Sequence, residues 1–395
     1  MNLRIPEPVT ILLMEFPSKY PLLSFLVRQD IKKLSREMEV SIQAGDIVGL
    51  LYDAFLKQYK NPEREETLKS LNVLCVRLVF CLYAEDAGIF GRRAMFHDYM
   101  AAFETPHMRS ALKDLFRVLD EIPEKRDPYL IPSLAEFPYV NGGLFADETI
   151  EIPMLTDEIR ELLLVKASEN FNWSEISPTI FGAIFESTLN PETRRSGGMH
   201  YTSIENIHKV IDPLFLDDFR KELEEIKAIS VVKTRNQKLA DFQSKLAALE
   251  FLDPASGSGN FLTETYVSIR RLENEAISAR FGGQMTIGDV SNPIQVSIRQ
   301  FHGIEINDFA VTVAKTALWI AESQMMQETE NILYDKHLEF LPLKTKANIV
   351  EANALRIDWN EVIPAEKLDY IMGNPPFVGA RLMDASQKED VNNIY

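Results

Sequence analysis

The sequence is poor in the residues that mark secreted or metal-binding proteins. Only two cysteines, Cys75 and Cys81, occur in 395 residues, and six histidines are scattered along the chain. The cysteines share one apolar stretch without CxxC spacing, so we expect buried core thiols, no disulfide framework and no metal site. This cysteine usage fits a reducing cytosol.

An excess of basic residues is also missing. Lys and Arg number 42 against 59 Asp and Glu, which gives a formal net charge of −17. This balance argues against a protein that coats nucleic acid or anionic membranes by bulk charge. The best membrane candidate, residues 73–83, is too short to span a bilayer, and residues 1–14 lack a signal-peptide layout. We therefore expect a cytoplasmic protein without a membrane partner.

The hydrophobic pattern divides the chain into a helical part and an α/β part. Apolar residues recur at helical spacing in residues 1–120 and again at 157–167, with a proline- and glycine-containing loop or hairpin region at 127–152. This pattern predicts a mainly helical domain over residues 1–170. Residues 171–250 continue as helices, and short strands alternate with helices from 251 to 395. The expected strands are 249–253, 300–306, 348–351 and 368–372, with helices at 259–280 and 308–326. This order predicts a parallel, doubly wound, Rossmann-like sheet with right-handed crossovers.

The strongest motif is DPASGSGNF at residues 253–261, which joins the first strand to the next helix. Such a glycine turn lets the backbone approach a ligand and directs helix N–H groups towards it. The missing Gly-Lys-Ser/Thr ending argues against a phosphate-binding P-loop. The glycines alone are equally consistent with a tight strand-to-helix turn that binds no ligand.

A second motif, GIEIN at residues 303–307, places Glu305 at the tip of the second strand. A carboxylate there can accept hydrogen bonds from both ribose hydroxyls of a nucleoside cofactor. The alternative is a helix-capping acid, although Asn307 or Asp308 can also fill that role. Both interpretations stay open at this point.

A third motif, Asn374-Pro375-Pro376-Phe377, follows the fourth strand. The two prolines fix the backbone and remove two N–H donors. The side-chain oxygen of Asn374 and the carbonyl of Pro375 are then free to accept both hydrogens of an amino group on a planar ring, which Phe377 can stack. An ordinary proline turn explains Pro376, but it does not explain the flanking Asn and Phe.

In this order, the three motifs resemble those of the class I S-adenosylmethionine-dependent DNA amino-methyltransferases, and NPPF resembles the adenine-N6 branch. The chain is most similar to the large methylases of fused type IIG and IIL restriction–modification enzymes and to related phage-defence methylases. Residues 198–203, GMHYTS, are similar to the family's cofactor-proximal motif ahead of the first strand. Residues 176–186 also recur in such proteins, and residues 73–90 are similar to the helical spacer before the methylase core.

The resemblance implies a helical spacer followed by a class I methyltransferase sheet. Such a protein binds S-adenosylmethionine and methylates N6 of an adenine flipped out of double-stranded DNA, without a metal. The implied catalytic residues are Asn374, Pro375, Pro376 and Phe377. The implied cofactor-binding residues are Tyr201, Thr202, Asp253, Ala255, Gly257, Gly259, Glu305, Asn353 and Ala354.

Within this set, residues 253–259 would line the methionine part of the cofactor, Glu305 would bind the ribose and residues 353–355 would meet the adenine. Asn353 departs from the family, which usually has Asp at this place. An Asn can still accept a hydrogen bond from the adenine amino group, so we expect binding to survive.

The family pattern has three further strands and a target-recognition domain beyond the position of Tyr395. We therefore expect a partial methyltransferase core, either a fragment of a longer protein or one that another subunit completes. Two other functions stay open: methylation of a protein glutamine amide, which suits Asn-Pro-Pro-aromatic, and a non-catalytic module that binds cofactor or a partner. The basic pairs at 92–93, 194–195 and 270–271 are expected on solvated surface.

Overall fold

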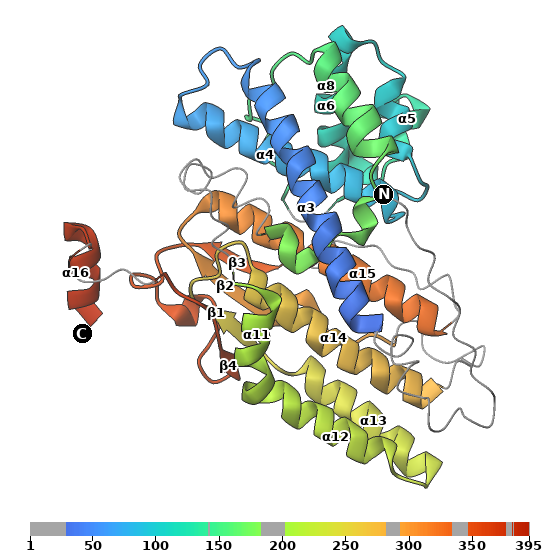
Figure 1. Cartoon of the computed structure of the whole chain (residues 1–395), viewed down its shortest axis with the longest axis vertical. Coiled ribbons are helices and arrows are strands. Elements are labelled where there is room, and N and C mark those ends of the chain that lie inside the picture. The colour runs from blue at the N-terminus through green and yellow to red at the C-terminus, as the bar shows by residue number, and fades with distance from the viewer. Residues whose placement is uncertain are drawn as a thin grey trace, which may run out of the picture.

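The computed structural model describes residues 29–140, 143–182, 202–281, 293–333, 347–376, 381 and 383–394, with side chains from residue 39 onwards. A helical region lies above a small sheet that carries its own helices (Figure 1). The α/β class predicted from the sequence is therefore confirmed.

The helical region is built around α4 (Glu65–Asp86), most of whose residues are buried. Its other helices are α3 (Gln29–Leu56), α5 (Met95–Ala101), α6 (Thr105–Asp120), α7 (Pro132–Ala135) and α8 (Asp157–Glu161). Cys75 and Cys81 on α4 are buried and unpaired, as predicted. Within the described part of the chain, α4 alone is long and apolar enough for a membrane span, yet 78% of that stretch is packed inside the protein.

The sheet has four strands in the order β3-β2-β1-β4, and every pair of neighbours is parallel. The strands are β1 (Phe251–Asp253), β2 (Phe301–Glu305), β3 (Asn348–Glu351) and β4 (Tyr370–Ile371). Each lies inside its predicted range, and β3 has the predicted ends. Because the chain passes from β3 to the far side of β1, the strand order reverses between β1 and β4. Parallel sheets bind ligands at the carboxyl ends beside such a reversal.

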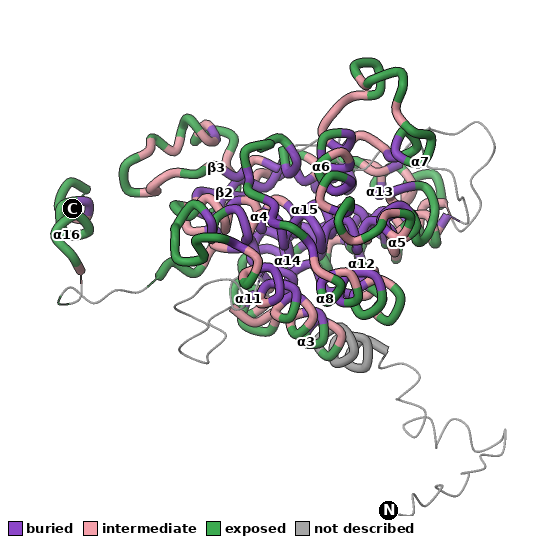
Figure 2. Tube along the Cα trace, turned by 90° about the horizontal axis from the view of Figure 1, so that it is seen from above, coloured by how far each residue is buried: buried purple, intermediate pink, exposed green. Residues whose placement is uncertain are grey.

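Helices α14 (Asn260–Phe281) and α15 (Asp308–Leu333) cover one face of the sheet, because each crosses in the same direction between neighbouring strands. Figure 2 shows both as buried elements at the centre of the molecule. The other face, with Leu252 and Ile304, packs against residues 352–368. That connection has only a short 3₁₀ helix, Trp359–Glu361, so among the described residues the long helices lie on one face.

The segment before β1 folds into three helices: α11 (Ile204–Ile211), α12 (Asp217–Lys227) and α13 (Val232–Ala247). The Ser203 hydroxyl accepts a hydrogen bond from the Asn206 N–H at 3.3 Å and so caps α11. A π-helical turn, Asp212–Leu216, joins α11 to α12. Its Phe215 ring lies 4.8 Å from that of Tyr370, so these helices cover the β1–β4 side.

The helical region is attached to the sheet region along α15. Lys69 on α4 forms an ion pair with Asp308, the first residue of α15. Further along, the Tyr83 hydroxyl donates to the Ile320 carbonyl at 3.3 Å, and the Gln327 side chain donates to the Ala87 carbonyl at 2.6 Å. One helix therefore belongs to both regions.

The expectation that both residues of the pair 270–271 lie on solvated surface is wrong for Arg270. Arg270 is 1% exposed, because α15 packs over α14 at this point. Its guanidinium pairs with Glu273 on the same helix and donates to the Thr329 hydroxyl at 2.8 Å. Burial is tolerable because the charge is paired and hydrogen-bonded. Arg271, Arg92 and Arg93 are exposed, as predicted.

Candidate active site at the carboxyl edge of the sheet

The glycine turn after β1 is fixed to β2 by a hydrogen bond from the Ser256 N–H to the Ile304 carbonyl at 3.0 Å. Gly257 and Gly259 have φ angles of +52° and +83°, which glycine adopts without strain. A Cβ on Gly259 would lie 2.8 Å from the Cβ of Ala314, so this glycine lets α15 pack closely. A Cβ on Gly257 would meet nothing within 4 Å, so the turn is open on this side.

Glu305, at the end of β2, reaches across to this turn. One carboxylate oxygen accepts a hydrogen bond from the Gly257 N–H at 2.8 Å, and the other accepts from the Asn307 N–H at 2.9 Å. The side-chain oxygen of Asn307 accepts from the Ala310 N–H at 3.0 Å and so caps α15. Because Asn307 is the cap, the capping interpretation of Glu305 is not needed.

Asp253 is deeply buried, with 1% of its surface exposed. Its carboxylate accepts a hydrogen bond from the Ala255 N–H at 3.0 Å. Gly373, just after β4, lies so close that a Cβ there would overlap the same carboxylate oxygen. Burial, reinforced by the charge of Glu305, raises the pKa of Asp253 to about 7. The acid therefore changes its protonation state near neutral pH.

Asn374 and Thr202 meet, although 172 positions separate them in the sequence. The Asn374 side-chain nitrogen donates a hydrogen bond to the Thr202 hydroxyl oxygen at 3.0 Å. The exposed Asn374 thus stands beside the turn that Asp253 begins, because its neighbour Gly373 packs on that acid. Thr202 of the cofactor-proximal motif and Asn374 of the NPPF motif therefore lie together at one edge of the sheet.

The remaining residues of these two motifs are only partly described. Pro375 and Pro376 are exposed at the same edge. Tyr201 and Phe377 lie outside the described residues, so their predicted roles have no geometry to compare with.

Asn353 makes two contacts within the protein. Its side-chain oxygen accepts from the Leu355 N–H at 2.9 Å, and its nitrogen donates to Asp390 at 3.0 Å. Asp390 belongs to helix α16 (Ala385–Ile394) and also accepts from the Arg356 guanidinium at 2.7 Å. The contact with a cofactor adenine stays a prediction for Asn353, since both ends of its amide already have protein partners.

The turn that carries Asn353 is joined to the rest of the site by its backbone. The N–H of Ala352 donates to the Glu305 carbonyl at 2.8 Å, which continues the β2–β3 pairing past the strand ends. The Ala354 carbonyl accepts from the indole N–H of Trp359 at 2.8 Å. Ala354 is therefore held near Glu305.

A polar cluster behind the glycine turn was missed from the sequence. His208 on α11 bonds Asp212 through one ring nitrogen, at 2.8 Å, and Glu264 on α14 through the other, at 3.1 Å. Glu264 also accepts from the Thr179 hydroxyl at 2.8 Å. The Glu264 hydrogen bond, followed by that of Asp212, raises the pKa of His208. The four-residue spacing of His208 and Asp212 is a signal in the sequence, whereas the distant partner Glu264 has none.

These features fit a nucleoside cofactor at the strand ends. The side of the turn at Gly257 has room for a ligand, and carboxylates at Asp253 and Glu305 are acceptors for the ammonium and hydroxyl groups of such a molecule. Within the described residues, no group of three or more His, Cys, Asp or Glu is arranged to hold a metal ion.

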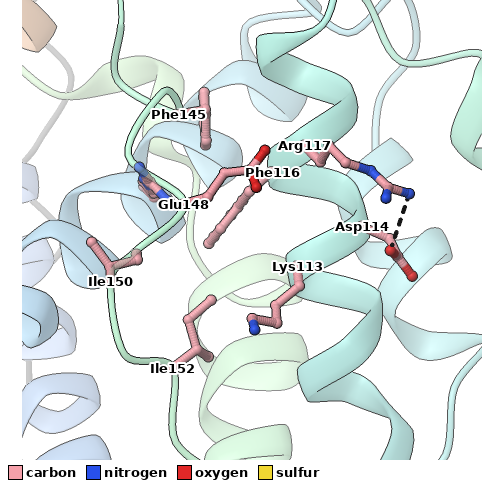
Figure 3. Close-up of a pocket in the computed structure, with 9 residues that line it drawn as sticks. Lys113, Asp114, Phe116, Arg117, Phe145, Glu148, Ile150 and Ile152 are labelled. Atoms are coloured by element: carbon pink, nitrogen blue, oxygen red, sulfur yellow. Dashed lines mark hydrogen bonds and ion pairs between the residues drawn. The ribbon is translucent and has the colours of Figure 1, made fainter. Parts of the chain in front are cut away.

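A hollow in the helical region is separate from this site (Figure 3). It lies between α6 and the segment that follows Phe145, and it is lined by Arg77, Lys113, Asp114, Phe116, Arg117, Phe145, Glu148, Ile150 and Ile152. The Arg77 guanidinium is already held by the carbonyls of Leu144 and Asp147, both at 2.8 Å. None of the predicted site residues that the structure describes lines this hollow.

Comparisons with known proteins agree with this arrangement. Residues 229–395 match the model of the protein family described as MmeI, DNA-methyltransferase domain. Residues 69–145 match the model described as MmeI, helicase spacer domain. The first match contains β1 to β4 and the second begins within α4, so the two parts seen in the fold correspond to two known domains.

Individual relatives share this organisation. The chain is 36% identical over 378 residues to DNA methyltransferase A of Bacillus subtilis strain 168, covering 94% of this chain and 41% of that protein. It is 26% identical over 290 residues to a putative type II restriction enzyme and methyltransferase of Methanocaldococcus jannaschii, covering 63% of this chain and 24% of the relative.

A solved structure is also similar. The type IIL restriction–modification enzyme MmeI in complex with DNA superposes with a TM-score of 0.76 at 38% sequence identity, over 89% of this chain and 45% of that one. The chain therefore spans less than half the length of each of these relatives.

Proposed function

The chain carries the helicase spacer and DNA-methyltransferase domains of the MmeI family, and from this premise we propose that it methylates N6 of adenine in double-stranded DNA with S-adenosylmethionine as methyl donor. The family recognised from the motifs is thereby confirmed. The adenine target and the identity of the donor are our proposal.

One observation carries the adenine proposal. Asn374 stands exposed at the strand-end edge, with its amide nitrogen bound to Thr202 and its neighbour Gly373 packed on Asp253. An amide oxygen fixed at this place suits an amino group presented by a flipped base. Because Asp253 opens the glycine turn, the acceptor for the amino group and the proposed cofactor turn adjoin each other.

The protein's part in the reaction follows from these positions. Asn374 Oδ1 and the Pro375 carbonyl would accept hydrogen bonds from the two N6 hydrogens, which leaves the nitrogen lone pair free to take the methyl group. The methylated nitrogen would then release one proton to solvent. Glu305 would hold the ribose hydroxyls, and the open side of the turn at Gly257 would leave room for the rest of the ligand. When bound, S-adenosylmethionine supplies a methyl group on positively charged sulfur. Positioning and charge account for the catalysis.

We further propose that DNA recognition depends on polypeptide outside these 395 residues, in the same chain or in another subunit. The greater length of the relatives supports this proposal. The net charge of −17 also supports it, because a negatively charged chain binds a phosphate backbone poorly. Double-stranded DNA is the proposed partner, and a restriction–modification or phage-defence system in the cytoplasm is the proposed setting.

The test combines binding with product analysis. Calorimetry should show that S-adenosylmethionine binds the wild type and that binding is lost in Asp253→Ala. Transfer of a labelled methyl group to unmethylated genomic DNA, measured with the full natural polypeptide, should give label in N6-methyladenine. Asn374→Ala should bind cofactor but not transfer, while the exposed Asn206→Ala on α11 should behave as wild type.

Other results would redirect the proposal. Label in cytosine or in protein glutamine would exclude the adenine assignment while preserving a methyltransferase. Absence of cofactor binding by the wild type would contradict the catalytic proposal and favour a non-catalytic module.

A further inference from the structure

Thr202, for which the resemblance implies a cofactor contact, also contacts Asn374. Its hydroxyl oxygen accepts a hydrogen bond from Asn374 Nδ2 at 3.0 Å. Among the described residues, no donor bonds the other end of this amide, Asn374 Oδ1. The contact therefore leaves the acceptor end of Asn374 available.

The orientation of this amide decides what it can recognise. An asparagine side chain has an acceptor oxygen and a donor nitrogen of nearly the same size, so its two orientations differ mainly in hydrogen bonding. With Nδ2 on Thr202, Oδ1 is the atom left for an incoming amino group. The opposite orientation would present N–H donors to the hydrogens of that amino group, which repels it.

Both partners are held in place by their surroundings. Ser203, the residue after Thr202, caps α11 through the Asn206 N–H at 3.3 Å. Helix α11 is tied to α14 by the contact between His208 and Glu264, at 3.1 Å. Thr202 is thus fixed by the start of a helix that is itself anchored to the core.

Asn374 is restrained from its other side. The residue before it, Gly373, packs directly on the Asp253 carboxylate. The residue after it, Pro375, has a ring that restricts the backbone of Asn374. The backbone of Asn374 is therefore well defined, and the freedom that remains is rotation of its side chain. The Thr202 hydroxyl restricts that rotation.

We propose that Thr202 is a positioning residue that sets the Asn374 amide with its oxygen towards the amino group to be methylated. This inference rests on the proposed function for its consequence in catalysis, whereas the amide orientation itself does not depend on any substrate. Thr202 acts through Asn374 and need not touch the cofactor.

The orientation is tested without cofactor or DNA. In protein labelled with ¹⁵N-asparagine, the side-chain NH₂ signals of Asn374 are assigned by their loss in Asn374→Asp. Thr202→Val should shift these signals, because it removes the acceptor, and Thr202→Ser should leave them near their wild-type positions. Unchanged signals in Thr202→Val, measured on protein with wild-type melting behaviour, would overturn the proposal.

The catalytic consequence is tested with the full natural polypeptide and DNA. Thr202→Val should lower kcat roughly tenfold, the effect of losing one orienting hydrogen bond, with the cofactor Kd unchanged. Thr202→Ser should restore kcat to within about twofold, since it restores the acceptor. Thr105→Val, which removes a surface hydroxyl bonded to Asp157, serves as control.

The outcomes separate this inference from the proposed function. A weaker cofactor Kd with unchanged kcat in Thr202→Val would assign Thr202 to the cofactor and overturn the positioning role. A wild type that methylates an acceptor other than adenine N6 would refute the proposed function, while the NMR result would still decide the amide orientation.

Discussion

The carboxylate of Glu305 accepts a hydrogen bond from the backbone N–H of Gly257 at 2.8 Å, so the end of β2 holds the glycine turn that follows β1. Two motifs that are 48 positions apart in sequence are therefore one structural unit. The shape of the turn depends on an acid that we also propose as the ribose acceptor. Loss of this acid is expected to affect both the turn and ligand binding.

Glu305→Ala should weaken S-adenosylmethionine binding about 10- to 100-fold, the range for a lost hydrogen bond to a charged group. Calorimetry on the 395-residue chain measures the change. Glu351→Ala, which removes the exposed carboxylate at the end of β3, should bind as the wild type does. Equal weakening in both variants would show that general negative charge, and not the place of Glu305, matters.

Asp253 should make the free energy of unfolding fall as pH rises towards neutrality. Its pKa is raised from 3.8 to about 7 in the folded protein, so between these values the folded state holds a proton that the unfolded state has released. Stability from this group is present below pH 3.8 and is lost by about 7, with a limiting slope of roughly 1 kcal/mol per pH unit.

Denaturant unfolding of the wild type and of Asp253→Asn at several pH values measures this contribution. The variant should have the flatter profile in the window between pH 4 and 7. If the unfolding free energy changes with pH equally in the two proteins, the Asp253 carboxyl has the same pKa in the folded and the unfolded state.

The two glycines of the turn should differ when alanine replaces them. The Cβ that Gly257→Ala adds has no neighbour within 4 Å. This variant should therefore lose about 1–2 kcal/mol of unfolding free energy from its positive φ angle alone. Gly259→Ala adds a contact of 2.8 Å with the Cβ of Ala314, so it should cost about 1–3 kcal/mol more.

Thermal or denaturant unfolding orders these two variants. Measured against Ala314→Gly alone, Gly259→Ala should cost less than it does in the wild type, because the nearest clashing carbon is gone while the backbone strain remains. If the unfolding free energy lost in Gly259→Ala is the same with Ala314→Gly present, the loss comes from the positive φ angle of residue 259 and not from the contact with Ala314.

His208 should stabilise the protein more in mild acid than in base. Its pKa is raised above 6.5 by Glu264 and then Asp212, with Arg220 also beside Asp212. The contribution is complete below pH 6.5 and is lost as pH rises through the raised folded value. His208→Gln should reduce the fall in unfolding free energy as pH rises. His107→Gln, on the exposed side of α6, should leave that fall unchanged.

Unfolding free energies at pH 6 and at pH 9 for both variants check the assignment. The wild type minus His208→Gln difference should be larger at pH 6. A constant difference would mean that the cluster stabilises α11 by shape and neutral hydrogen bonds only.

The chain order of motifs predicted the sheet well. The strand Asn348–Glu351 has its predicted ends because its apolar residues are bounded by polar ones on both sides. Helix α15 continues seven residues beyond the predicted Met326, because Thr329 bonds the buried Arg270 and Leu333 packs beside Ile277. These partners lie on α14 and cannot be read from the periodicity of α15.

Long-range polar contacts escaped prediction for the same reason. The bond between Thr202 and Asn374, and that between Asn353 and Asp390, join segments whose separation in sequence has no pattern. Local motifs predict which strand end a residue occupies, because parallel strands align their carboxyl ends. Which side chain then meets which depends on the packing of α11 and α16, for which the sequence has no signal.

Helix α15 has consequences for the independence of the two regions. Most of its residues are buried, against α14 on one side and against α4 on the other. A sheet region expressed without α4 would expose an apolar stripe to water and should self-associate. The helical region is therefore expected to keep the sheet region soluble by covering α15. An exchange of helical regions between relatives should preserve the side that faces α15.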